Sequence, residues 1–139
     1  MFLTEKDLRD AFWKNYNYSK RALKYQFECD VRPGAADLVT VEQFQFQGNY
    51  QINAFEFKLS DIKKAILQAK ENAKFVNKSW IVIPDEKKEL VEMKYGNILR
   101  NYGIGAITVE EGGRWNMIIR PLYRTEIMLN QTIINLLFN

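Results

Sequence analysis

Histidine is absent from the 139 residues of this chain, and cysteine occurs once, at Cys29. Without an imidazole group, Ser-His-Asp and Cys-His triads and nucleases that bind their metal through histidine are excluded. A single cysteine forms no internal disulfide, and there is no Cys/His cluster to hold zinc. Any catalysis must therefore use carboxylates, lysine, hydroxyl groups or a hard metal ion.

Long apolar runs are also lacking. The opening residues, MFLTEKDLRDAF, carry charges every few positions, unlike a signal peptide, and nowhere do about eighteen uncharged apolar residues follow one another. We therefore expect a cytoplasmic protein.

The net charge of +3 permits a polyanionic partner but does not require one. The length and the 47% hydrophobic content suit a single domain over residues 1–139.

Hydrophobic periodicity predicts the order helix, three strands, helix, strand, helix, two strands, helix. The expected helices are one that Thr4 caps, then 61–77, 85–102 and 125–139. The expected strands are 23–29, 36–41, 51–59, 79–83, 105–109 and 114–120. A helix between 51–59 and 79–83 implies that these two strands are parallel, whereas a short turn joins the last two strands as a hairpin. The sequence thus predicts an α/β fold with a mixed sheet flanked by helices.

Three polar residues stand out in the expected hairpin of 36–41 and 51–59. Asp37 is a carboxylate among small and apolar neighbours. Glu56 and Lys58 lie on one side of their strand, because side chains two positions apart share a face. If the two strands pair, Asp37 and Glu56 are neighbours, and two adjacent carboxylates repel each other unless a cation or a shared proton intervenes.

A divalent metal ion would relieve this repulsion. Oxygen ligands without histidine or cysteine favour hard ions, so Mg²⁺ or Mn²⁺ is the expected cofactor. Asp37, Glu56 and the backbone carbonyl of Phe57 are the candidate ligands. Such an ion activates a water molecule and neutralises charge on a phosphodiester. Lys58 would stabilise the developing negative charge or position the water.

This order of residues resembles the PD-(D/E)XK (restriction-endonuclease-like) nuclease superfamily, over residues 23–84. Gln68 resembles the helix glutamine that several of its subfamilies place beside the active site. Ala36 stands where the motif has proline, and Asn72 where a tyrosine often follows the glutamine. The resemblance implies a core of order αβββαβ, here with an added helix, β-hairpin and C-terminal helix. It also implies a metal-dependent nuclease acting on DNA, with Asp37, Glu56, Lys58 and Gln68 as the catalytic residues.

Some members of the superfamily add an acid from the first helix or first strand. Glu5 and Glu28 are the candidates in this chain. Glu28 is favoured because the alternation of Tyr25, Phe27 and Cys29 leaves it opposite the apolar face.

Three basic residues are candidates for contact with nucleic-acid phosphates. Arg32 precedes a Pro-Gly turn, and Lys63 and Lys64 lie at the start of the helix after Lys58. Lysines along a helix are more often simply solvated, so these assignments depend on where the fold places them.

Two other functions remain open. The chain is alternatively a catalytically inactive DNA-binding or protein-assembly module, because a fold does not fix a function. The apolar segment 125–139 needs a surface to cover, either its own core or a second subunit in a homo-oligomer. The sequence leaves the substrate open among duplex, single-stranded and branched DNA and RNA.

Overall fold

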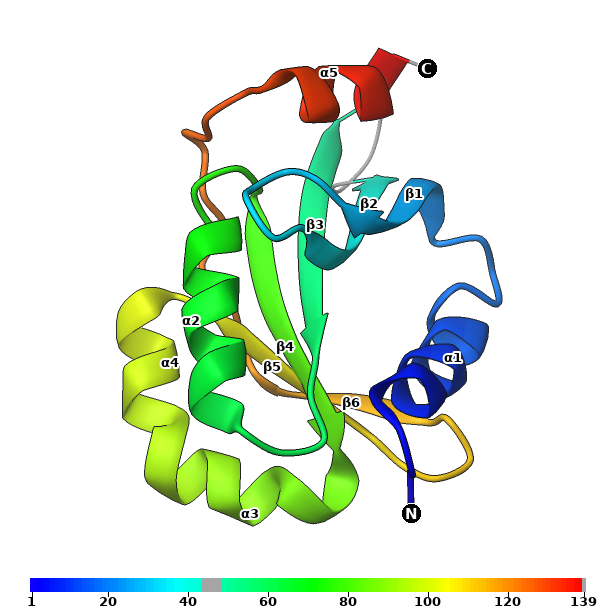
Figure 1. Ribbon diagram of the computed structural model, residues 1–139, viewed down its shortest axis with the longest axis vertical. Helices are drawn as coiled ribbons and strands as arrows, with labels where there is room; N and C mark the ends of the chain where they lie inside the picture. Colours follow the sequence, from blue (N-terminus) through cyan, green and yellow to red (C-terminus); the bar gives the residue numbers. More distant parts are fainter. Residues whose placement is uncertain (44–48, 139) are drawn as a thin grey trace.

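The computed structural model describes residues 1–43 and 49–138 of the chain. Its centre is an open, mixed sheet of six strands that follow one another in sequence order (Figure 1). The strands are β1 (Ala22–Cys29), β2 (Ala36–Gln43), β3 (Tyr50–Phe57), β4 (Lys78–Pro84), β5 (Gly105–Val109) and β6 (Trp115–Ile119). Strands β3, β4 and β5 are parallel, and the other neighbouring pairs are antiparallel. The prediction of an α/β fold with a mixed sheet is confirmed.

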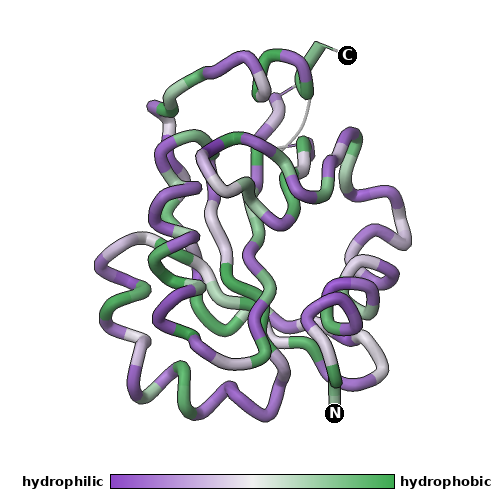
Figure 2. The backbone as a smooth tube through the Cα atoms, in the orientation of Figure 1, coloured by the Kyte–Doolittle hydropathy of each residue, from purple (hydrophilic) through white to green (hydrophobic). Residues whose placement is uncertain are grey.

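Helices cover both faces of this sheet. They are α1 (Glu5–Tyr16), α2 (Ile62–Asn72), the short turns η1 (Asp85–Lys87), α3 (Lys88–Leu90) and η2 (Val91–Tyr95), then α4 (Gly96–Tyr102) and α5 (Gln131–Phe138). Figure 1 shows α1 on one side of the sheet and α2 with α4 on the other. Along these outer helices hydrophilic and hydrophobic residues alternate (Figure 2), as expected of helices that bury one face. Within the described residues, no helix is long and apolar enough to span a membrane.

Helix α1 begins where the sequence predicts, because the Thr4 side chain accepts a hydrogen bond from the Asp7 backbone N–H at 3.0 Å. Its inner face buries Leu8 and Phe12 against Phe55 and neighbouring residues of the sheet. Helix α1 therefore lies over the same strands that carry the candidate catalytic residues.

The opposite face is covered in two parts. Helices α2 and α4 pack on β4 and β5 through a buried cluster that includes Ile66, Ile81 and Leu99. Helix α5 packs on the other half of this face, with Ile133 fully buried beside Val39 and other residues of β1 to β3. The C-terminal segment thus covers the chain's own core.

Three predicted helices have different limits in the structure. Helix α2 ends at Asn72 rather than 77, because the Lys74 and Phe75 amides bond carbonyls three residues back and turn the chain away. The expected helix 85–102 is divided into four pieces, with a π-helical turn at η2. Helix α5 starts only at Gln131, because the Asn130 side chain accepts a hydrogen bond from the Ile133 amide and so caps it.

Strand β1 differs from the expected half-buried strand. It forms an edge of the sheet, and its register with β2 shifts between Ala22 and Lys24. Leu23 and Tyr25 are consequently about half exposed, at 54% and 49%. The connection after β2 falls largely on residues 44–48, which lie outside the described part of the chain.

Candidate active site

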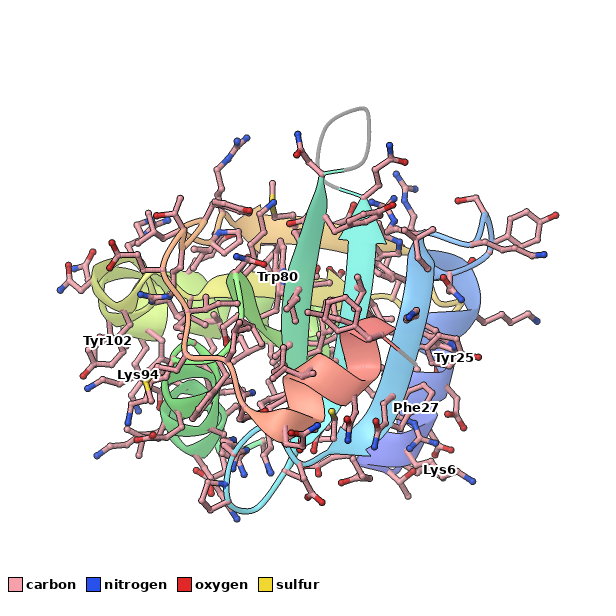
Figure 3. The ribbon with its side chains drawn as sticks, turned by 90° about the horizontal axis from the view of Figure 1, so that it is seen from above. Lys6, Tyr25, Phe27, Trp80, Lys94 and Tyr102 are labelled. Atoms are coloured by element: carbon pink, nitrogen blue, oxygen red, sulfur yellow. The ribbon has the colours of Figure 1, made fainter. Side chains whose placement is uncertain are left out.

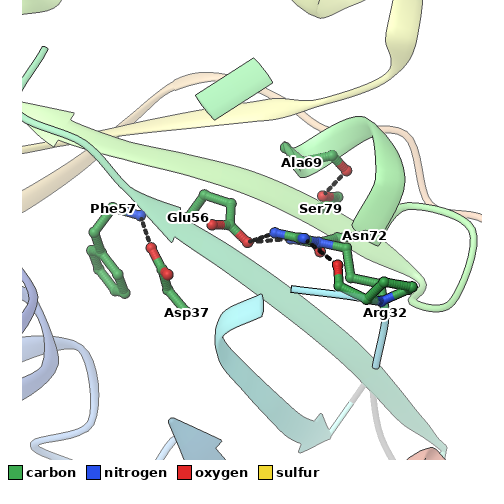
Figure 4. Close-up of polar contacts among 8 residues, drawn as sticks. Arg32, Asp37, Glu56, Phe57, Ala69, Asn72 and Ser79 are labelled. Atoms are coloured by element: carbon green, nitrogen blue, oxygen red, sulfur yellow. Dashed lines mark hydrogen bonds and ion pairs between the residues drawn. The ribbon is translucent and has the colours of Figure 1, made fainter. Parts of the chain in front are cut away.

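Asp37 and Glu56 lie side by side where β2 and β3 pair. Leu38 is opposite Phe55 in the antiparallel register, so Asp37 and Glu56 face each other one position beyond the last recorded pair of the ladder. The Asp37 carboxylate also accepts a hydrogen bond from the Phe57 backbone N–H at 2.9 Å (Figure 4). Glu56 is 1% exposed, whereas Asp37 is half-buried. The hairpin therefore brings together the two carboxylates that the sequence singles out.

The Glu56 carboxylate is held by two side chains from other elements (Figure 4). Its Oε2 accepts hydrogen bonds from Asn72 Nδ2 at 2.7 Å and from Arg32 Nη2 at 3.2 Å. Arg32 Nε in turn donates to the Asn72 side-chain carbonyl. Arg32 comes from the β1–β2 turn and Asn72 from the last position of α2. Two side chains far from Glu56 in sequence therefore donate hydrogen bonds to the same oxygen of its carboxylate.

The pKa of Glu56 is raised to about 7. Burial is the largest cause, and the negative charge of Asp37 is the second. The hydrogen bond from Asn72 and the positive charge of Arg32 act in the opposite direction. A carboxyl group with a pKa this close to neutrality is typical of functional sites, although structural ion-pair networks also shift pKa values.

A cavity of about 130 Å³ opens beside Asp37. It is lined by Glu5, Lys6, Arg9, Glu28, Asp37 and Phe57. Lys58 lies just beyond β3, and its Nζ is 3.8 Å from the Glu5 carboxylate. Both additional acids that the sequence suggests thus line one cavity with Asp37, and Lys58 is joined to that cavity through Glu5.

Glu28 has an unusual backbone conformation at the wall of this cavity. Its φ is 49°, in the left-handed region that side chains other than glycine seldom occupy. Such a conformation costs roughly 1–3 kcal/mol and is often found at functional sites. On either side of Glu28, Phe27 and Cys29 pack in two different core clusters, so the alternation of faces is broken at this residue.

Gln68 lies on α2 one turn before Asn72, so the two side chains share a side of the helix. Its Oε1 is buried and has no hydrogen-bond partner among the described residues. A buried acceptor without a partner requires an explanation such as a bound water or ligand. Gln68 is therefore compatible with the role that the resemblance implies.

The basic residues expected to contact phosphates are placed differently from one another. Arg32 is engaged with Glu56 and is 9% exposed. Lys63 lines a groove between α2 and α4 together with Lys94 and Tyr102. In Figure 3, Lys94 and Tyr102 lie on the opposite side of the molecule from Lys6, which lines the cavity beside Asp37. Lys64 is exposed on the first turn of α2. Of the three, only Arg32 contacts a residue of the proposed catalytic set.

Sequence reasoning missed three residues of this site. The sequence marks Asn72 only as a position where the motif often has tyrosine, although its four-residue spacing from Gln68 places both on the same side of α2. Lys6 and Arg9 were not singled out, because charged residues on a first helix are usually solvated. Only the packing of α1 against β3 reveals that they line the cavity beside Asp37.

The oxygen ligands of the site suit a hard divalent cation. Mg²⁺ is commonly bound through one or two carboxylates, with water and substrate phosphates completing its shell. Asp37 and Glu56 would hold it, with the Phe57 carbonyl as a further candidate ligand. Across residues 1–43 and 49–138, no group of three or more acidic or thiol side chains is arranged to hold a metal. The charge of Asp37 still raises the pKa of Glu56 although Arg32 and Asn72 contact it, and this repulsion and the unpartnered Gln68 oxygen both fit a bound cation and its waters.

No model of a known protein family matches the chain, and no curated protein matches it significantly.

Proposed function

We propose that this protein is a metal-dependent nuclease of restriction-endonuclease-like fold that hydrolyses phosphodiester bonds in DNA. The element order α1-β1-β2-β3-α2-β4 supports this proposal, since it corresponds to the αβββαβ core of that superfamily. The observation that carries it is the pairing of Asp37 with Glu56, whose pKa of about 7 is raised partly by its neighbour.

In the proposed reaction water attacks the phosphorus atom. A new P–O bond forms, the bond to the leaving sugar oxygen breaks, and the products are a phosphate monoester and a hydroxyl end. A divalent cation at Asp37 and Glu56 would supply Lewis-acid activation and charge neutralisation. Lys58 would stabilise negative charge on the phosphate, since its ammonium group lies 3.8 Å from the Glu5 carboxylate that lines the cavity and is therefore near the proposed site. Gln68 would accept a hydrogen bond from a water molecule in the site.

The test is cleavage of supercoiled plasmid and of labelled single-stranded, duplex and branched oligonucleotides with Mg²⁺ or Mn²⁺. We expect metal-dependent cleavage that falls at least about 100-fold in Glu56→Gln and Lys58→Ala, as is usual when a transition-state contact is removed. Glu126→Gln is the matched control, because Glu126 is exposed and lines a groove other than the cavity beside Asp37. Cleavage that survives Glu56→Gln unchanged would point to a contaminating nuclease and overturn the proposal, as would no cleavage of any substrate.

A second candidate is a DNA-binding or protein-assembly module without catalytic activity. The ion pair of Arg32 with Glu56 favours it, since a guanidinium group at this carboxylate competes with a metal ion. Such a module would bind DNA with an affinity that falls as salt rises, with or without a divalent cation. Calorimetry that detects no Mn²⁺ binding, together with salt-dependent DNA binding, would support this candidate over the nuclease.

A further inference from the structure

The contacts of Arg32 concern the site of the proposed function but are not explained by it. Arg32 and Asn72 both donate to the same oxygen of Glu56, and Arg32 also donates to Asn72. The Glu56 and Arg32 side chains are 1% and 9% exposed, and Asn72 is fully buried. A buried ion pair contributes little net stability, because removing both charges from water costs about as much as their attraction returns. Stability alone therefore does not account for this arrangement.

The charges indicate what Arg32 does. Asp37 and Glu56 carry two negative charges when ionised, and the Arg32 guanidinium compensates one of them. A divalent cation at the two carboxylates would by itself neutralise their charge, and Arg32 beside it would then leave a net charge of about +1. A phosphodiester brings one negative charge. The guanidinium group is a good ligand for a phosphate, because its fork of N–H donors matches two of the oxygens.

Arg32 lies in a turn outside the paired strands, whereas Asn72 belongs to a helix that packs on the sheet. Arg32 lies in the turn between β1 and β2 and is followed by Pro33 and Gly34, so its side chain can leave without breaking a strand pair. Asn72 belongs to α2, whose inner face packs on the sheet. When Arg32 leaves, Asn72 can continue to hold the Glu56 Oε2 atom.

We propose that Arg32 is an exchangeable counter-ion of Glu56: a divalent cation displaces its guanidinium group, which then binds the substrate phosphate while Asn72 keeps Glu56 in position. The binding of a substrate phosphate by Arg32 rests on the proposed nuclease function. The displacement of Arg32 from Glu56 does not, because metal binding alone tests it. Arg32 is thus a phosphate-binding residue in the loaded site, and Asn72 is a positioning residue.

Calorimetric titration with Mn²⁺ tests the exchange. We compare wild type, Arg32→Gln, Arg32→Lys and Asn72→Ala at about pH 8.5, where carboxylates with ordinary or moderately raised pKa values are ionised. Arg32→Gln should bind Mn²⁺ about three- to tenfold more tightly, because one competing charge is removed. Arg32→Lys keeps the charge and should remain near wild type, whereas Asn72→Ala should bind more weakly. Arg114→Gln, which removes an exposed arginine, is the matched control for net charge.

The same variants separate this inference from the nuclease proposal. If wild type cleaves DNA, Arg32→Gln should have a raised KM for DNA despite its tighter metal binding, a combination that a purely structural residue would not produce. Mn²⁺ binding that is unchanged or weaker in folded Arg32→Gln overturns the exchange, whatever the nuclease assays give. Tighter binding in a protein that cleaves nothing supports the exchange and overturns the nuclease proposal.

Discussion

At the scale of single residues, the proposed metal site depends on the protonation of Glu56. The folded chain raises the pKa of Glu56 to about 7, first through burial and then through the charge of Asp37. A metal ion at the proposed site would bind the ionised carboxylate, so a proton and a cation would compete for the same group. Below the raised pKa, metal binding would therefore release a proton.

The affinity of the protein for Mn²⁺ should therefore depend on pH around neutrality. We expect it to be nearly constant above about pH 8 and to fall up to about tenfold per pH unit below pH 7, with release of close to one proton. Calorimetry in buffers of different ionisation enthalpy measures both quantities. Glu42→Gln is the control, because burial also raises the pKa of Glu42 but its carboxylate is occupied by Tyr16 and Thr40. A constant affinity between pH 5.5 and 8.5 would show that Glu56 is not a ligand.

The sequence predicts the position of Asp37 and Glu56 better than it predicts their surroundings. Strand alternation and hairpin pairing are local rules, and together they place these two carboxylates side by side. The contact between Arg32 and Asn72 joins residues 40 positions apart. It depends on how α2 packs on the sheet and where that helix ends, and no local pattern encodes either.

At the scale of elements, the cavity depends on how α1 is held over β3. The turn of the β5–β6 hairpin contacts α1, and Gly113 in this turn is buried with a φ of 95°. A Cβ atom at Gly113 would lie 2.8 Å from the Ala11 carbonyl oxygen of α1. The N-terminal amino group also pairs with Glu111 in the same turn. The hairpin thus positions the helix that carries Glu5.

Replacing Gly113 with alanine should displace α1 and lower stability. Both the left-handed backbone and the short contact with Ala11 oppose a side chain, so we expect a loss of about 1–3 kcal/mol in the free energy of unfolding. Urea denaturation followed by tryptophan fluorescence measures it. Gly112→Ala is the matched control, because a Cβ there would meet nothing within 4 Å. Equal stability of the two variants would mean that α1 tolerates the displacement without cost.

The residues at which helices begin and end are harder to predict from the sequence than whether a segment is a helix or a strand. The strands and helices occur in the predicted order, because hydrophobic periodicity reports which face each segment buries. The end of α2 is set by the backbone hydrogen bonds of Lys74 and Phe75, and the start of α5 by the Asn130 side chain, which also bonds the distant Val31 carbonyl. The π-helical turn at η2 has no sequence signal that we can identify.

At the scale of the whole molecule, the sequence predicts that segment 125–139 packs either on the chain's own core or on a second subunit. The structure places α5 on the sheet face formed by β1 to β3, where Ile133 is buried among residues such as Cys29 and Val76. Ile134, the next residue, is 37% exposed and Phe138 is 80% exposed. One side of α5 therefore completes the core, while a homo-oligomer through its outer side remains a prediction.

Adjacent isoleucines on α5 allow a matched test of these two roles. Ile133→Ala should lower the free energy of unfolding by about 2–5 kcal/mol, because it leaves a cavity in a fully buried cluster. Ile134→Ala should change it by less than about 1 kcal/mol if α5 serves only its own chain, since substitutions at partly exposed positions have small effects. Guanidinium denaturation at several protein concentrations measures both. If Ile134→Ala removes a concentration dependence that wild type shows, the outer side of α5 contacts a second subunit. If Ile133→Ala costs nothing, α5 does not contribute to the core.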